Sequence, residues 1–239
     1  MSDTFLSAFS EAARLIASLD AGLLEIVGLS LQVSLSAVAI AALIGLPLGA
    51  ALALFRFPGR RAVALLFSAL MGLPPVVLGL VVYLMLSRAG PLGVLGLLYT
   101  PAAMIIAQTL LVLPIVVALS RQAIADLWRD YEEAMRSLVI TGWRLVRTML
   151  YEARHALLMV LLAAFGRAIA EVGAVMIVGG NIDHATRVMT TAIALETSKG
   201  NLALALALGG ILLALALAVN VAAQLLAAAS QRLGSAVTS

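Results

Sequence analysis

The sequence contains no cysteine and only two histidines. The lack of cysteine excludes a disulfide framework, a thiolate metal site and a cysteine nucleophile, and two histidines argue against a histidine-rich metal centre. There is also no recognisable Ser/His/Asp set, no His-Glu-x-x-His sequence and no glycine-rich phosphate loop. We therefore predict that the chain is not an enzyme, has no catalytic or metal-binding residues, binds no cofactor itself and does not hydrolyse ATP.

Charge is also scarce. Only 11% of the residues are charged, 63% are hydrophobic, and the mean hydropathy is +1.12. A soluble domain averages about a quarter charged residues, and a soluble fold of this length could not cover so much apolar surface with polar groups. The expected solvent is the lipid bilayer. The net charge of +3 does not indicate a nucleic-acid partner, because the basic residues lie between apolar blocks, where the positive-inside rule is the better account.

Five blocks of the sequence are long enough to cross a membrane. A spanning helix needs about 20 apolar residues, because the hydrocarbon core is about 30 Å thick. Each of the five is apolar nearly all round, unlike the one-sided stripe of a soluble surface helix. The blocks are residues 23–55, 62–86, 101–119, 156–178 and 202–229. The prediction is an all-α integral membrane protein with about five transmembrane helices.

The basic residues between the blocks predict the orientation. Most of them fall on one side: Arg56, Arg60, Arg61, Arg121, Arg129, Arg136, Arg144, Arg147, Arg154 and Arg232. The other side has Arg14, Arg88, Arg187 and Lys199. The positive-inside rule places the first group in the cytoplasm. The N-terminus is then expected outside and the C-terminus inside.

Three regions follow from this arrangement. Residues 1–21 are predicted to be an external N-terminal segment, residues 22–230 the transmembrane domain and residues 231–239 a cytoplasmic tail. Apolar residues at helical spacing in residues 5–19 favour a short interfacial helix, with a frayed terminus as the alternative. The first twenty residues lack the basic start and cleavage site of a secretory signal, so we take them as part of the mature protein.

Glycine and proline interrupt several blocks. Gly45 with Gly49, and the pair Gly209–Gly210, are predicted to allow close helix packing. Pro74 and Pro75 break the second block. Backbone groups that proline frees inside a membrane must be satisfied by neighbouring helices or by a water-lined cavity. Close packing and a bend beside a transport pathway therefore both stay open for this pair.

A mostly polar segment, residues 122–155, separates the third and fourth blocks and is expected in the cytoplasm. Its apolar residues recur at steps of four and three, which indicates one face of a helix: Leu127, Tyr131, Ala134, Leu138, Thr141 and Leu145. Gly142 interrupts this pattern, and a second helix is expected over residues 143–154. Trp and Arg are enriched at protein interfaces. The segment is therefore interpreted as a docking element, with a solvated loop helix as the alternative.

Within this segment, Glu133-Ala134-Met135 followed by Trp143 resembles the cytoplasmic EAA loop of ABC importer permeases. Met135, Val139 and Tyr151-Glu152 depart from the Glu-Ala-Ala, Gly and Leu-Pro of the usual loop. The resemblance implies a coupling helix that fits a cleft on a separate ATPase subunit. It assigns ATPase coupling to Glu132, Glu133, Ala134, Arg136, Ser137, Trp143 and Arg144.

The resemblance extends over about residues 25–230. Residues 72–79 and 90–93 look like oxyanion permeases, and residues 165–182 and 186–201 look like the tungstate branch of the molybdate/tungstate family, which has a MetI-like transmembrane domain. Molybdate permeases share most of this pattern, so a molybdate or sulfate-type permease is the alternative.

Membership of this family would imply inward transport of an oxyanion, with tungstate as the expected cargo, by alternating access in a homodimer. The implied partners are an ABC ATPase dimer, which would bind ATP and Mg²⁺, and an extracytoplasmic oxyanion-binding protein. The implied location is the inner membrane of a bacterial or archaeal cell.

Two charged residues, Arg167 and Glu171, lie inside the fourth block. An ionised group there costs roughly 3 kcal/mol or more on insertion scales unless it is paired or faces water. Four residues apart, the two side chains share a helix face and can pair. A paired arginine would not trap an anion, so we favour a structural or gate-positioning role over direct substrate binding.

The outer segment after the fourth block carries hydrogen-bond donors. A tetrahedral oxyanion is well held by hydroxyl and N–H groups, and Asn181, Arg187, Thr190 and Thr191 could supply them. A loop that docks the binding protein is the alternative, and His184 is expected to be a polar turn residue. Together the pathway and gate candidates are Pro74, Pro75, Arg167, Glu171, Gly173, Asn181, Arg187, Thr190 and Thr191.

A stand-alone secondary transporter or channel is the competing function. It would need coupling-ion carboxylates at broken helices, or an inverted repeat. The sequence has one strong intramembrane acid, Glu171, and no obvious repeat.

Overall fold

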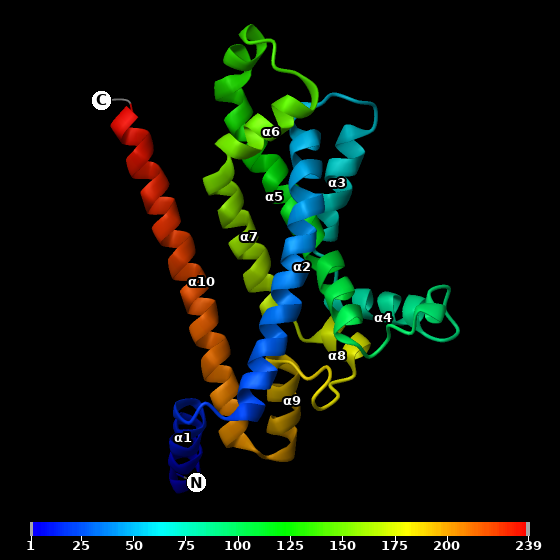
Figure 1. Cartoon of the computed structure of the whole chain (residues 1–239), viewed down its shortest axis with the longest axis vertical. Coiled ribbons are helices and arrows are strands. Elements are labelled where there is room, and N and C mark those ends of the chain that lie inside the picture. The colour runs from blue at the N-terminus through cyan, green and yellow to red at the C-terminus, as the bar shows by residue number, and fades with distance from the viewer. Residues whose placement is uncertain (1, 238–239) are drawn as a thin grey trace. The chain divides into compact units, whose positions relative to one another are not determined.

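The chain is all-α, as predicted. The computed structural model describes residues 2–237, with side chains for residues 8–225, and no strand occurs in that range (Figure 1). The helices are α1 (Ser2–Ala17), α2 (Ala21–Leu54), α3 (Arg60–Leu70), α4 (Pro75–Leu86), the 3₁₀ turn η1 (Gly93–Leu95), α5 (Pro101–Ser137), α6 (Gly142–Glu152), α7 (Arg154–Ile169), α8 (Gly173–Gly179), α9 (Met189–Lys199) and α10 (Leu202–Val237).

Three of the described helices can each cross a bilayer by length and composition: α2, α5 and residues Leu202–Leu225 of α10. The number rises to 5 if the pairs α3–α4 and α6–α7 each form one broken span. The predicted count of about five is therefore the upper end of what the described helices allow, and the chain is a multi-pass membrane protein.

The predicted second span is not one helix. Helix α3 ends at Leu70, and α4 begins at Pro75 after Pro74, whose backbone is extended with φ −62° and ψ 125°. Proline has no N–H to donate and disfavours helical backbone at the residue before it. Consecutive prolines therefore end one helix and start the next, with Pro75 at the first helical position.

The predicted fourth span is also interrupted, at residues 170–172 between α7 and α8. This break contains no proline, so the sequence carried no comparable signal for it. The third block, in contrast, continues as one helix past residue 119 to Ser137. The fifth runs on to Val237, and the expected N-terminal helix is present as α1.

The chain divides into two compact units. Unit 1 comprises Met1–Ala37, Pro74–Gln108 and Arg167–Ala218, and unit 2 comprises Val38–Leu73, Thr109–Gly166 and Val219–Ser239. Helices α2, α5, α7 and α10 each contribute residues to both units.

In unit 1, α4 and α8 approach closely at two glycines. A Cβ atom on Gly79 would lie 2.7 Å from Ala174 Cα, and one on Gly173 would lie 2.7 Å from Val76 Cγ2. The core beside this contact draws on α2, α4, α5 and α8. Its buried residues are Val33, Val82, Leu86, Ala103, Met104, Ala107, Ala174, Val175, Val178 and Val188.

In unit 2, α2 packs on α5 at the predicted glycine pair. A Cβ atom on Gly45 would lie 2.8 Å from Val116 Cγ1, and one on Gly49 would collide with the Ser120 hydroxyl. The packing role predicted for Gly45 and Gly49 is confirmed. It is not seen for Gly209–Gly210, where added Cβ atoms would meet open space among the described residues.

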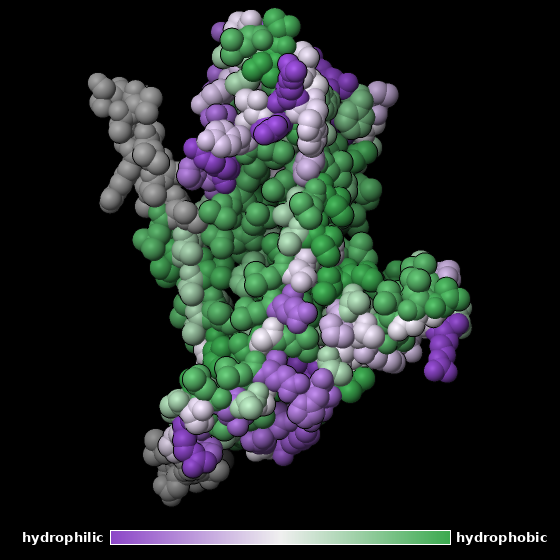
Figure 2. Space-filling view, in the orientation of Figure 1, coloured by the Kyte–Doolittle hydropathy of each residue, from purple (hydrophilic) through white to green (hydrophobic). Residues whose placement is uncertain are grey.

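Large apolar side chains are exposed on the helices that can span a bilayer. Leu43 on α2, Leu84 on α4 and Leu213 and Leu217 on α10 are all more than half exposed. Figure 2 shows apolar residues over much of the visible surface. A protein dissolved in water rarely exposes contiguous apolar patches of this kind, so the surface fits lipid as the solvent.

The α4–α8 approach gives the first prediction. A helical glycine changed to alanine normally gains up to about 1 kcal/mol, but Gly79→Ala should lower stability by about 1–3 kcal/mol because the new methyl group overpacks against Ala174. Thermal unfolding of the detergent-purified chain measures the change. The matched control, Gly209→Ala, enters open space and should be neutral or stabilising. Equal melting temperatures for the two variants would contradict the close approach.

Candidate functional site

The predicted coupling segment lies in unit 2, where a tight turn joins α5 to α6. The N–H of Ile140 donates to the Met135 carbonyl and the N–H of Val139 to the Arg136 carbonyl, both at 3.1 Å. This is the Schellman pattern of a helix C-terminus, in which the residue after the cap takes left-handed backbone. That residue is Val139, with φ 56°. The resemblance to the EAA loop expected glycine here, and the turn explains why glycine suits the position.

The buried face of the segment packs on α2 and α5 within unit 2. Leu127 and Tyr131 lie on this face as predicted. Leu145 is buried as predicted. The prediction is wrong for Ala134, Leu138 and Thr141, which are exposed because α5 ends at Ser137 and the chain turns, and Met135 is buried instead. The buried cluster consists of Ala50, Ala53, Ile124, Met135, Leu145, Val146, Met149, Ala153 and Leu157.

The opposite face of the turn is an exposed apolar surface with polar edges. Leu138, Val139 and Trp143 are 65%, 78% and 66% exposed, and we call these three the coupling tip. Glu133 and Arg144 are exposed beside it. Along α5, Arg136 forms an ion pair with Glu132 at 2.5 Å, and the Ser137 hydroxyl donates to the Ala134 carbonyl. All seven predicted coupling residues thus lie on or next to this one turn.

A second candidate region is the break between α7 and α8 in unit 1. The Glu171 side chain is only 3% exposed and pairs with Arg167 Nη1 at 2.6 Å. Its other oxygen accepts the N–H of Ala174 at 3.1 Å, at the start of α8. The predicted ion pair is present, but the two residues do not share one continuous helix, because α7 ends at Ile169 between them.

Other side chains satisfy the backbone around this break. Thr190 donates its hydroxyl proton to the Glu171 carbonyl at 2.7 Å, and Gln108 Nε2 donates to the Ala168 carbonyl at 3.1 Å. Unpaired backbone groups are costly in an apolar medium, so these contacts allow the helix to be interrupted. Gln108 was not among the predicted residues. A lone amide in an apolar block was the signal that could have identified it.

The two breaks meet within unit 1. Val76, in the first turn of α4 after Pro74 and Pro75, touches Gly173 in the first turn of α8. Six predicted pathway candidates therefore surround one place: Pro74, Pro75, Arg167, Glu171, Gly173 and Thr190. Their role in a pathway stays a prediction, whereas the contacts between them serve close packing and backbone pairing.

The remaining candidates lie at the start of α9 in unit 1. The Thr191 hydroxyl donates to the Val188 carbonyl at 3.1 Å, and Asn181 Nδ2 donates to the Thr191 carbonyl at 3.4 Å. Arg187 is paired with Asp183 at 2.7 Å. In this conformation the Thr191 hydroxyl, Asn181 Nδ2 and Arg187 Nη1 donate to the chain's own oxygens, and Arg187 Nε is buried without a partner among the described residues. Binding of an anion by them stays a prediction and would require these bonds to open.

Ser30 is a further residue that was not foreseen. Its hydroxyl donates to the Ile26 carbonyl at 2.7 Å and accepts the N–H of Met189 at 2.8 Å. This contact attaches the first turn of α9 to α2 within unit 1. It satisfies an amide that the start of a helix leaves without an intrahelical partner.

A small cavity of about 220 Å³ lies beside this region, also in unit 1. It is lined by three carboxylates, those of Asp20, Glu25 and Asp183, together with His184 and Arg187. His184 Nδ1 lies 2.8 Å from Glu25 Oε2. The hydrogen bond to Glu25, with the negative charges of Glu25 and Asp183, raises the pKa of His184 above its usual 6.5. The excess of carboxylates repels an oxyanion from this cavity.

The sequence also matches known proteins. The family model for the inner membrane component of binding-protein-dependent transport systems matches residues 45–232. The chain belongs to this family. A probable anion ABC transporter permease of Haloferax volcanii is 47% identical over 83% of this chain and 88% of that protein.

Two further relatives are named as tungstate uptake system permeases TupB. The protein from Peptoclostridium acidaminophilum is 42% identical over 89% of this chain and 93% of its own length. The protein from Campylobacter jejuni is 42% identical over 70% of each chain. Permeases named for sulfate are more distant, at 28% to 29% identity.

The Arg167–Glu171 pair gives the second prediction. Removing one partner of a buried pair lowers stability by about 3–5 kcal/mol, because the other charge is left unpaired. Arg167 is partly exposed, so the loss for Arg167→Gln should be at the lower end of this range or below it. The double variant Arg167→Gln/Glu171→Gln leaves no charge behind and should be more stable than Arg167→Gln alone. Thermal unfolding in detergent measures Arg167→Gln, Glu171→Gln and the double variant. Losses that simply add would contradict a coupled pair.

The third prediction concerns pH. Because the pKa of His184 is raised in the folded protein, its pairing with Glu25 stabilises the fold fully below pH 6.5 and is lost as pH rises through the folded value. NMR titration of a His155→Gln background, which leaves one imidazole, should give a pKa above 6.5. Adding Glu25→Gln should lower it, with Asp183 and Arg187 still present. An unchanged titration would contradict the contact.

Proposed function

We propose that this chain is the permease subunit of an ATP-driven importer that moves tungstate inward by alternating access. The family assignment, and the two tungstate permeases at 42% identity over most of the chain, support this proposal. A molybdate or sulfate-type permease is the alternative. The greater distance of the sulfate relatives favours tungstate over sulfate.

The proposed assembly is a homodimer of this chain with two ABC ATPase subunits and an extracytoplasmic oxyanion-binding protein. The family description, which names a binding-protein-dependent system, supports the last of these. ATP and Mg²⁺ bind the ATPase, because this chain has no glycine-rich phosphate loop. The assembly lies in the inner membrane of a bacterial or archaeal cell.

The coupling tip is the single observation that carries the ATPase-docking part of the proposal. Three large apolar side chains, Leu138, Val139 and Trp143, stand exposed on a rigid turn. The other face of the turn is fixed by Val146 and Met149, which are buried against α2 and α5. A buried aromatic anchor with a polar rim is the usual energetic centre of an interface. Glu133 and Arg144 supply that rim.

Movement of the tip acts directly on a long helix. Helix α5 is continuous from Pro101 to Ser137, so the helix that ends at the turn is also the helix that carries Gln108. Gln108 donates to the Ala168 carbonyl at the end of α7. Helix α5 is therefore the element of this chain that the proposed ATPase contact would move first.

An ATPase-independent transporter fits these contacts less well. Such a transporter needs a carboxylate free to bind a coupling ion near a broken helix. Glu171 is at such a break, but its oxygens are taken by Arg167 and by the Ala174 N–H. In the proposed importer the binding protein selects the anion. The path through this chain therefore needs to bind the anion only weakly.

The fourth prediction tests the docking surface. Trp143→Ala should weaken capture of the ATPase about thirty-fold, because truncating an aromatic anchor of an interface costs about 2 kcal/mol or more. Glu133→Ala should lower transport coupling, and both variants should remain in the membrane, since neither side chain is buried. Pull-down of the ATPase and tungstate uptake by cells provide the two measurements.

The matched control is Tyr151→Ala, which removes another exposed aromatic residue from α6, near its far end. It should leave ATPase capture unchanged. Normal capture and normal uptake by both the Trp143 and Glu133 variants would refute docking at the coupling tip.

A further inference from the structure

Unit 2 contains an open cleft of about 870 Å³ that is lined by four arginines. Arg56 lies in the connection between α2 and α3, Arg60 and Arg61 are the first two residues of α3, and Arg121 lies on α5. We call it the four-arginine cleft. The other lining residues are Phe57, Gly59, Ala62 and Ala64, so no carboxylate lines it.

These arginines differ from their neighbours on α5 in having no acidic partner. Arg129 pairs with Asp126 and Arg136 with Glu132. Among the described residues, none of the four cleft arginines forms an ion pair. Four unneutralised guanidinium groups around one space repel one another, and an anion in the cleft would relieve that repulsion.

Two of the four arginines are held in place by the fold. Arg60 donates from Nε to the Leu52 carbonyl at 2.7 Å and from Nη2 to the Ala53 carbonyl at 3.1 Å, at the C-terminal end of α2. Arg121 is brought beside α2 because Gly49 lets the two helices touch. The Nε atom of Arg121 is buried and has no hydrogen-bond partner among the described residues. The hydrogen bonds to α2 fix the Arg60 guanidinium at the cleft, and Arg121 keeps a donor that no described group satisfies.

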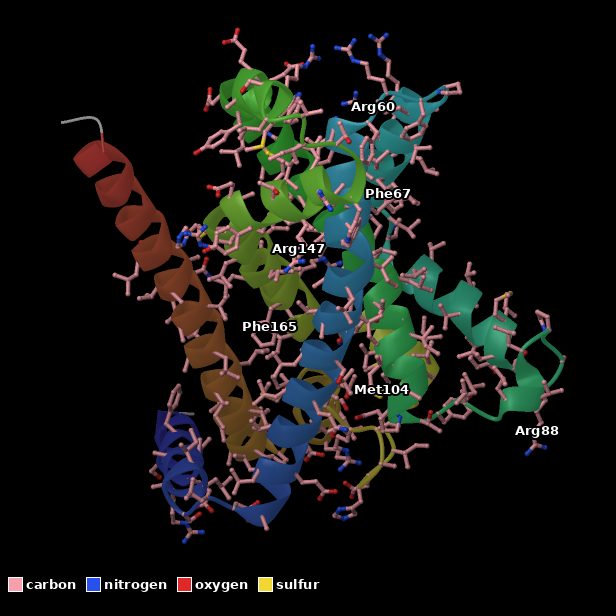
Figure 3. All side chains as sticks on the ribbon, turned by 45° about the horizontal axis from the view of Figure 1, so that its top comes forward. Arg60, Phe67, Arg88, Met104, Arg147 and Phe165 are labelled. Atoms are coloured by element: carbon pink, nitrogen blue, oxygen red, sulfur yellow. The ribbon has the colours of Figure 1, made fainter. Side chains whose placement is uncertain are left out.

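The helix that begins at the cleft, α3, carries exposed apolar side chains. Helix α3 buries none of its residues, and its Leu65 and Leu66 are among the most exposed apolar side chains of unit 2. Figure 3 shows Arg60 at the start of α3 and Phe67 further along the same helix. A ligand that matches both features carries an anionic group next to an apolar chain. A free oxyanion would use the arginines but leave the apolar surface of α3 uncovered.

We propose that the four-arginine cleft binds the phosphate group of an anionic phospholipid, with the acyl chains along α3. Basic pockets at the ends of membrane helices hold such headgroups through guanidinium–phosphate hydrogen bonds and charge. The bound phosphate offsets part of the positive charge of the cleft and fixes the connection between α2 and α3. This site requires neither the ATPase nor the transported anion.

Native mass spectrometry of the detergent-purified chain tests the proposal, with phosphatidylglycerol and phosphatidylcholine as probes. Phosphatidylglycerol should bind and phosphatidylcholine should not. Arg56→Gln/Arg61→Gln should weaken phosphatidylglycerol binding about 30-fold. The Arg56 and Arg61 side chains are exposed and form no hydrogen bond or ion pair among the described residues, so the variant should fold. The control Arg88→Gln removes an exposed arginine of unit 1 and should leave binding unchanged.

Competition separates lipid from free anion. Millimolar inorganic phosphate or tungstate should not displace phosphatidylglycerol, because neither covers the apolar surface of α3. Displacement by either ion, equal binding of the two lipids, or full binding by the Arg56/Arg61 variant would each overturn the proposal. The assay contains no ATPase and no binding protein, so its failure would leave the proposed transport function unaffected.

Discussion

A helix inside a membrane can be interrupted only where other groups satisfy its backbone, and this constraint organises unit 1. The break at residues 170–172 is held by Glu171, whose carboxylate takes both Arg167 and the first free amide of α8, and by hydroxyl and amide donors from α9 and α5. The break before Pro75 meets it through Val76 and Gly173. A change at any of these groups leaves a polar atom unpaired in an apolar place. Interrupting these helices costs free energy. The buried polar side chains offset this cost by pairing the freed backbone groups, and the small residues allow the two breaks to pack closely.

The turn between α5 and α6 differs from the helix breaks, because it exposes apolar side chains instead of burying polar ones. Its inner face is anchored by Met135, Val146 and Met149 in unit 2, and its last carbonyls are satisfied by the turn itself. Leu138, Val139 and Trp143 are consequently presented on a structured base. Val139 takes left-handed backbone, an unfavourable conformation for a β-branched residue. The turn is therefore apolar and strained on its exposed face and anchored on its inner face.

The sequence predicted features that depend on composition and local spacing. Apolar blocks indicated the spanning regions, glycine spacing indicated the packing at Gly45 and Gly49, and a four-residue step indicated the Arg167–Glu171 pair. The interruption at residues 170–172 was not predictable, because it contains no proline and depends on donors from distant Gln108 and Thr190. Helical spacing also predicted a buried stripe that continues through Ala134 and Leu138. The helix ends at Ser137, and both residues are exposed. The hydroxyls of Thr190 and Thr191 were considered as anion donors because sequence does not reveal which carbonyls lie within their reach.

In the proposed function this chain contributes a path and a docking surface, while energy and anion selection come from its partners. The most direct test is uptake of labelled tungstate into proteoliposomes that contain this chain, its ATPase and its binding protein, with molybdate and sulfate as competitors. We expect uptake that needs ATP and both partners, with tungstate as the preferred anion. Uptake by the chain alone, driven by an ion gradient without ATP, would contradict it.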